Sequence, residues 1–231
     1  MVGRAGSWAS GSDFTHFDFP RISLRSEGVL FAWALAHPGS PVSRSWVTDT
    51  ECELEMRAVL RVAAGGAGHA AFSRFEAGTG GTEVLGNTST LGALALTSPS
   101  FLSTLAIAKA AIESRLATQA AGGVLNACAI HFNPPATHFS LGGSDPVALQ
   151  AVIGGTQGRM LWINSFTGNV ALRTYSMELN FMIFDDFGVD EHDLYAPGLI
   201  PFWVLQHERS ASKYAPFVNK LDLTATVSGT F

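Results

Sequence analysis

The chain has 231 residues, of which 47% are hydrophobic and only 14% are charged, and its formal net charge is -5. Typical soluble domains carry about 25% charged residues, so this composition excludes disorder and indicates a compact body with some apolar surface for a partner. The acidic balance, without any cluster of Lys and Arg, argues against a nucleic-acid-binding protein.

We expect neither a secretory signal peptide nor a membrane span. The first residues of the chain lack the apolar segment of a secretory signal peptide, and the longest apolar run, 29–36, is far shorter than the roughly 20 residues of a membrane span. We therefore expect a soluble protein made in the cytoplasm, without a transmembrane segment, whose export would need a specialised secretion system. Cys52 and Cys128 lack zinc-site spacing. We expect two buried thiols, with one disulfide between them as the alternative.

The first half of the chain has helical patterns. Thr48 and Glu51 are typical of a helix start, and Gly65-Gly66 predicts a break before a second helix. Ser98-Pro99 begins the clearest helix, whose apolar or small residues on almost every face indicate a central buried helix. The predicted elements are an irregular arm over 1–26 and helices over about 48–64, 67–77 and 100–121.

The second half has strand patterns. Short apolar runs predict strands over 124–132 and 137–141, and alternation of apolar and polar residues predicts longer strands over 159–166, 171–184 and 220–228. A hairpin turn is expected at 167–169, and a helix with buried Phe202 and Leu205 near Pro201. The sequence thus predicts one α+β domain over 27–231, with a helical layer at about 48–121 and an antiparallel sheet layer at about 124–231.

Carboxylates gather between the last two long strands, over 183–194. Two close carboxyl groups have different pKa values and can act as acid and base, and His207 is expected to return near the same end of the sheet. The candidate catalytic residues are therefore Asp186, Asp190, His207 and Glu208.

Two other interpretations of these carboxylates stay open. Asp185, Asp190 and Asp193 would offer hard oxygen ligands to Ca²⁺ or Mg²⁺, although their spacing does not match an EF-hand loop. Alternatively, Asp190 or Asp193 caps the next helical turn, Gly188 supplies a positive φ, and the other acids are solvated.

Four segments occur in an order that resembles a bacterial domain family of unknown function, found near secretion and toxin loci. They are Ile153-Gly-Gly-Thr-Gln-Gly158, Asp185–Asp190 with Asp193-Leu194, Phe202–His207 and Pro216–Val218. Family members usually have histidine where this chain has Asp186, so a role that needs that histidine does not carry over. The resemblance implies an exported effector or toxin-like domain, with secretion machinery or an immunity protein as partner.

Two functions of different classes follow as hypotheses. The first is an effector with hydrolase chemistry on cell-wall material, centred on the acidic stretch and His207. The second is a non-enzymatic binding, assembly or pore-forming module that uses its apolar surface and associates into oligomers.

Overall fold

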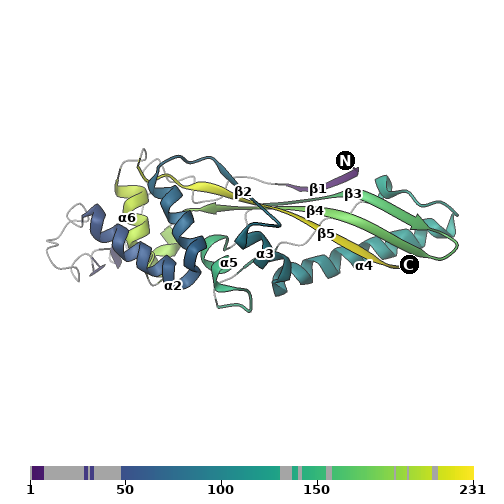
Figure 1. Cartoon of the computed structure of the whole chain (residues 1–231), viewed down its shortest axis with the longest axis horizontal. Coiled ribbons are helices and arrows are strands. Elements are labelled where there is room, and N and C mark those ends of the chain that lie inside the picture. Colours follow the sequence, from purple (N-terminus) through teal and green to yellow (C-terminus); the bar gives the residue numbers. More distant parts are fainter. Residues whose placement is uncertain are drawn as a thin grey trace.

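The computed structural model describes residues 2–7, 29–30, 32–33, 48–130, 137–139, 142–154, 158–189, 191–196, 198–209 and 213–231. They form one five-stranded sheet, in the order β1-β3-β4-β5-β2, with helices packed along it. Figure 1 shows that the molecule is elongated and that the sheet runs along its long axis, with α2 and α6 at one end and α4 at the other. The predicted α+β class is confirmed.

Long antiparallel strands build most of the sheet: β3 (Gly158–Asn169), β4 (Thr174–Phe187) and β5 (Phe217–Thr230). β4 pairs with β5 along its whole length, from Thr174 opposite Thr230 to Phe187 opposite Phe217. The predicted alternation is also confirmed, because one face of β4 is buried. Its residues are Tyr175, Met177, Leu179, Phe181 and Ile183.

Two short strands complete the sheet, and the sequence did not predict them. β2 (Thr82–Gly86) is parallel to Val218–Asp222 of β5, and β1 (Val2–Ser7) is antiparallel to β3. β1 lies within the arm predicted to be irregular, and residues 8–26 of that arm lie outside the described residues. Both strands pair with segments far away in the chain, so local patterns contain little of the information that places them.

The longest helix, α2 (Asp49–Glu76), begins as predicted. The Thr48 hydroxyl accepts a hydrogen bond from Glu51 N, and the Glu51 side chain accepts one from Thr48 N, which makes a capping box. The expected break is present as a kink at Gly65, where φ is 56° and ψ is -130°. Only glycine adopts this conformation without strain, so α2 is two helical arms joined at Gly65.

The helix α4 (Pro99–Ala121) begins at the Ser98 cap, as predicted, but it is not a central buried helix. Leu102 is 48% exposed and Ile107 is 52% exposed, while a single stripe that includes Phe101 and Ile112 is buried. Alanine-rich faces do not need a partner, so one stripe against the sheet is enough. The shorter helix α3 (Thr90–Thr97) precedes α4 at an angle of 59°.

Within the described ranges, no one helix has the length and apolar character to cross a bilayer. The bent pair of α3 and α4 meets those two criteria together, by length and composition alone.

Shorter elements correct further expectations. A 3-10 helix, η3 (Ala127–Ala129), stands where the strand over 124–132 was predicted, because the Asn126 side chain accepts from Cys128 N and turns the chain. Residues 137–139 contain only an isolated bridge.

The turn after β3 lies at 170–173, because the Asn169 side chain accepts from Leu172 N. Further helices are α5 (Val147–Val152), η4 (Glu191–Tyr195) and α6 (Ile200–Glu208).

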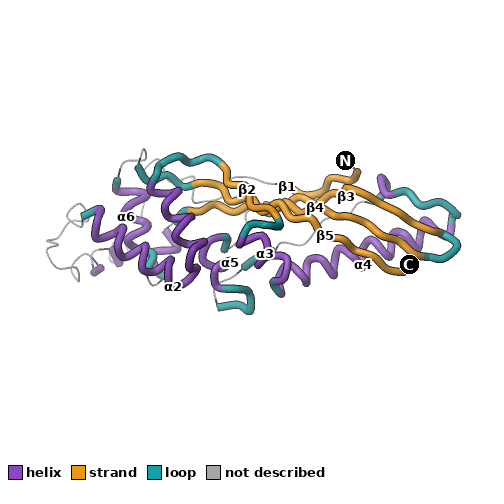
Figure 2. Tube along the Cα trace, viewed as in Figure 1, coloured by secondary structure: helices purple, strands orange, loops and turns teal. Residues whose placement is uncertain are grey.

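Aromatic rings fill the core between α2, α6 and the sheet. Figure 2 shows the two helices beside the strands at this end of the molecule. Phe75 of α2 meets Phe202 of α6 edge to face, with the ring centroids 4.5 Å apart. The ring centroid of Phe187 in β4 lies 5.2 Å from that of Phe202 and 5.0 Å from that of Phe217. Each such pair adds about 0.5–1.5 kcal/mol beyond the burial of its area, so these rings fix α2 and α6 on the ends of β4 and β5.

The kink yields a prediction that compares two neighbouring glycines. Gly65→Ala should destabilise the chain by about 1–3 kcal/mol, because its φ is positive. Gly66→Ala should be neutral or stabilise by up to about 1 kcal/mol, because Gly66 is not among the positive-φ glycines and an added Cβ meets no atom within 4 Å. Chemical denaturation measures the free energy of unfolding of both variants. Equal effects of the two substitutions would contradict the role of Gly65 in the kink.

Candidate functional site

The acidic stretch begins inside the sheet rather than after it. β4 continues through Phe187, so Asp185 stands opposite Asn219 and Asp186 opposite Val218. Asp185 is 7% exposed and Asp186 is 4% exposed. Successive strand residues point to opposite faces, so these two carboxyl groups do not converge on one ion or one substrate atom.

A buried amide holds the chain where it leaves β4. The Gln206 side chain accepts a hydrogen bond from Val189 N at 2.9 Å and donates one to Val189 O at 3.1 Å. Both residues are buried, so these bonds satisfy a peptide group that has no water available. Sequence reasoning missed this role of Gln206, and the only signal was a polar residue directly after the apolar run Ile200–Leu205.

His207 lies beside the same peptide, which confirms that this histidine returns to the acidic stretch. Its Nε2 is 2.9 Å from Val189 O, and its ring stacks on Trp203 with the centroids 4.7 Å apart. The same Nε2 lies 3.1 Å from Gln206 Nε2, so it either donates to the Val189 carbonyl or accepts from the Gln206 amide, according to the tautomer.

The positions of the other predicted site residues are described only in part. Asp190 lies outside the described residues, and so does the side chain of Glu208, whose backbone ends α6. Asp193 is partly buried in η4. Among the side chains that the structure describes, no three from His, Cys, Asp and Glu gather as metal ligands. Catalytic and Ca²⁺ or Mg²⁺ roles for this set stay predictions.

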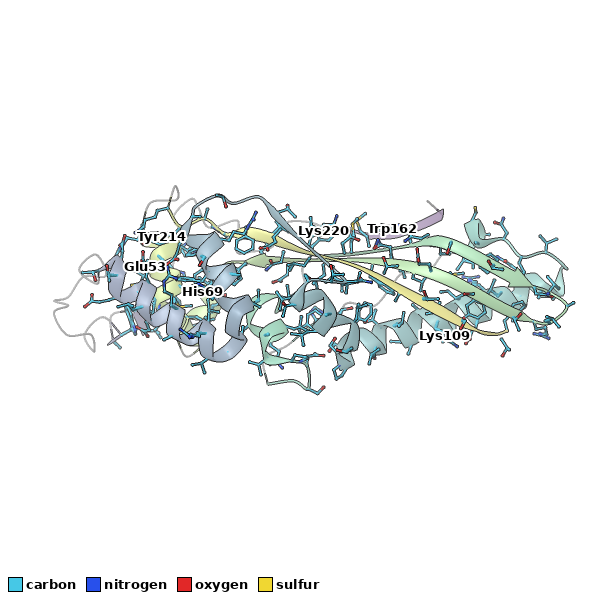
Figure 3. The ribbon with its side chains drawn as sticks, in the orientation of Figure 1. Glu53, His69, Lys109, Trp162, Tyr214 and Lys220 are labelled. Atoms are coloured by element: carbon cyan, nitrogen blue, oxygen red, sulfur yellow. The ribbon has the colours of Figure 1, made fainter. Side chains whose placement is uncertain are left out.

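A polar cluster that the sequence did not reveal lies at the start of α2. Tyr214 donates to Glu53 Oε1 at 2.5 Å, and Lys213 Nζ lies 3.1 Å from the same oxygen. Arg209 Nε donates to Asp49 Oδ1 at 2.7 Å. In Figure 3, Glu53 and Tyr214 lie together at the helical end of the molecule.

The charges in this cluster have a structural effect. Burial tends to raise the pKa of Asp49, but hydrogen bonds from Arg209, Lys213 and Tyr214 outweigh it and the pKa is lowered. The pKa of Glu53 is lowered in the same way, by Tyr214 and Lys213 against its burial. Both groups are therefore ionised at neutral pH, and they tie α2 to the segment between α6 and β5.

The two cysteines are free thiols in different environments. Cys52 is buried in α2, and burial raises the pKa of its thiol to about 12. Cys128 is exposed in η3, so the expectation of buried thiols is confirmed for Cys52 only.

The peptide held by Gln206 gives a prediction with an internal control. Gln206→Leu should lower the free energy of unfolding by about 1–3 kcal/mol, because it leaves the buried N–H of Val189 unpaired, while Val189 O keeps its contact with His207 Nε2. Gln119 makes the same two bonds to Asn126 N and O, at 2.7 and 3.0 Å, but in an exposed place. Water replaces those bonds, so Gln119→Leu should cost less than about 1 kcal/mol in the same denaturation experiment. A loss no larger for Gln206→Leu than for Gln119→Leu would contradict the role of Gln206.

No family model, no curated protein and no solved structure matches the chain. The resemblance seen in its motifs therefore stays a prediction.

Proposed function

We propose that the chain is an assembly module and that two copies join through the outer edge of β5. The observation that supports this proposal is an uncharged strand edge, Ala225–Thr230, that no described strand pairs with. This function belongs to the non-enzymatic class.

The outer edge of β5 is covered only over its first half. β2 pairs with residues Val218–Asp222. Next to them, the Asn87 side chain accepts from Thr224 N and donates to Thr224 O, both at 2.9 Å. Beyond Thr224, the described part of the chain places no strand on this edge.

The main-chain groups of this edge point outward at alternate residues. Val218 N donates to Gly81 O at 2.8 Å, and Thr224 bonds to Asn87, so even-numbered residues face away from β4. The β4–β5 register continues without a shift, so the same orientation holds for Thr226, Ser228 and Thr230. All three side chains are exposed.

This edge lacks the features that usually prevent pairing with another chain. Ala225–Thr230 contains no charged residue and no proline, and its register with β4 shows no bulge. The helix α4 approaches the face of the strand at Gly229, where an added Cβ would lie 2.4 Å from Glu113 Oε1. That contact covers a face of the sheet and leaves the hydrogen-bonding direction open.

A second copy of the chain fits this edge. Two identical edges pair antiparallel about a two-fold axis, which places the same patch on both subunits. With the axis at Ser228, Thr226 would pair with Thr230 of the other copy, and about six main-chain hydrogen bonds would form. The absence of charge from the edge means that no like-charged side chains oppose each other there.

Matched lysine substitutions test this assembly. Ser228→Lys places two lysines opposite each other across the proposed axis, so the dimer dissociation constant should rise roughly fivefold or more. Ser176 is exposed on β4 directly opposite Ser228 in the sheet, so Ser176→Lys adds the same charge one strand inward and should change little. Sedimentation velocity measures the dimer dissociation constant of both variants.

A charge exchange separates pairing from misfolding. Mixing Ser228→Lys with Ser228→Glu should restore a dimer, because opposite charges then face each other. A chain that is monomeric at every accessible concentration, or dimers that both lysine variants weaken equally, would overturn the proposal.

We propose as a second candidate the effector with hydrolase chemistry on cell-wall material. The contact between His207 and the peptide of Val189 supports it, because it brings the histidine to the acidic stretch. In this scheme Asp186 and His207 share protons with the substrate.

Conservative variants test the catalytic candidate. Asp186→Asn and His207→Gln should each lower peptidoglycan hydrolysis about a hundredfold, as loss of a general acid or base does. Circular dichroism confirms that each variant is folded. Full activity in both folded variants, or none in the parent chain, would exclude this chemistry.

A further inference from the structure

We infer that a cavity beside the kink of α2 binds a small primary ammonium ion. The cavity has a volume of about 180 Å³ and lies between the second arm of α2, the sheet, α3 and α5. Its lining includes Gly66, Ala70, Glu83, Leu85, Val152 and Asn219.

Asn219 gives the cavity a fixed acceptor. The residue is 1% exposed, and its Nδ2 donates to Val152 O at 2.9 Å. Because that carbonyl only accepts, the orientation of the amide is determined and Oδ1 points away from it. Within the described part of the chain, this is the one hydrogen bond that the side chain makes, so Oδ1 is left to accept from a ligand.

Glu83 adds a carboxylate at the rim. Its Oε2 is 4.0 Å from Arg74 Nε, which is a long ion pair. Arg74 has other partners, since it donates to Gly80 O at 2.8 Å and its guanidinium lies 4.9 Å from the centre of the Phe217 ring. Glu83 therefore keeps an acceptor for a second cation.

The nearest helix end does not favour an anion strongly. α3 begins at Thr90 beside the cavity, but the Ser89 hydroxyl already accepts from Gly92 N at 3.0 Å. A carboxylate and an amide oxygen in the lining then select a ligand that donates hydrogen bonds and carries positive charge.

Size and apolar walls define the rest of the ligand. An apolar cavity of roughly 150 Å³ is known to hold a molecule of about six heavy atoms, so a short alkyl chain fits here. Leu85, Leu91 and Val152 supply apolar contacts, and small residues such as Gly66 and Ala70 keep the space open. We therefore expect n-butylammonium to bind with its head on Asn219 and Glu83.

The site also adjoins the acidic stretch. Asp185 stands directly opposite Asn219 in the β4–β5 pairing, and both are buried. Paired residues of neighbouring strands point to the same face, so the carboxyl group of Asp185 lies beside the Asn219 side chain, although Asp185 is not itself a lining residue.

Titration of the full chain with n-butylammonium, followed by calorimetry and amide NMR shifts, tests the inference. The affinity for n-butylammonium should exceed that for n-butanol, and the amide NMR shifts should centre on the residues that line the cavity. Glu83→Gln keeps the shape and removes the charge, so affinity should fall about tenfold. Ala70→Leu should fill the mouth and abolish binding, whereas Ala58→Leu, at an exposed position of the other arm, should not.

Equal binding of n-butylammonium and n-butanol, or no binding at all to the folded chain, would overturn the inference. Unchanged affinity in both Glu83→Gln and Ala70→Leu would do the same. Ser228→Lys should leave amine binding intact, so failure of this site and failure of the strand-edge assembly can be told apart.

Discussion

The pairing of β4 with β5 is the constraint on which the rest of the structure depends. It runs without a register shift from Thr174–Thr230 to Phe187–Phe217 and so spans the molecule (Figure 1). One buried face of these strands receives α4 at one end and the aromatic contacts of α2 and α6 at the other. A slip by one residue would turn every apolar side chain of β4 to the opposite face, so the register also fixes where Asp185 and Asn219 lie.

Amide side chains complete the main-chain hydrogen bonding where the regular ladders end. Gln206 at Val189, Asn87 at Thr224 and Gln119 at Asn126 each accept from an N–H and donate to the C=O of one residue. An amide has the same donor and acceptor as a peptide, so it can replace one residue of a neighbouring strand. At Thr224 this replacement also ends the pairing that β2 begins, and it leaves the remaining edge of β5 open.

Sequence patterns predicted the elements whose signals are local. The capping box at Thr48, the break at Gly65, the Ser98-Pro99 start of α4 and the alternation in β4 and β5 depend on neighbouring residues and are confirmed. β2 was missed because five residues containing Glu83 have no strand signal until β5 lies beside them. The burial of α4 was overestimated because alanine is compatible with both water and a core.

The sequence predicted that His207 returns to the acidic stretch, but not how β4 places the carboxyl groups. An acidic cluster was expected to be a loop, yet β4 continues through Asp185 and Asp186, and their burial comes from their strand positions. Opposite faces of a strand separate their carboxyl groups, so closeness in sequence does not make them an acid–base pair. The cross-strand neighbour of Asp185 is Asn219, which is too far along the chain for any spacing rule to connect them. Long-range register, rather than composition, therefore decides which polar groups of this protein can act together.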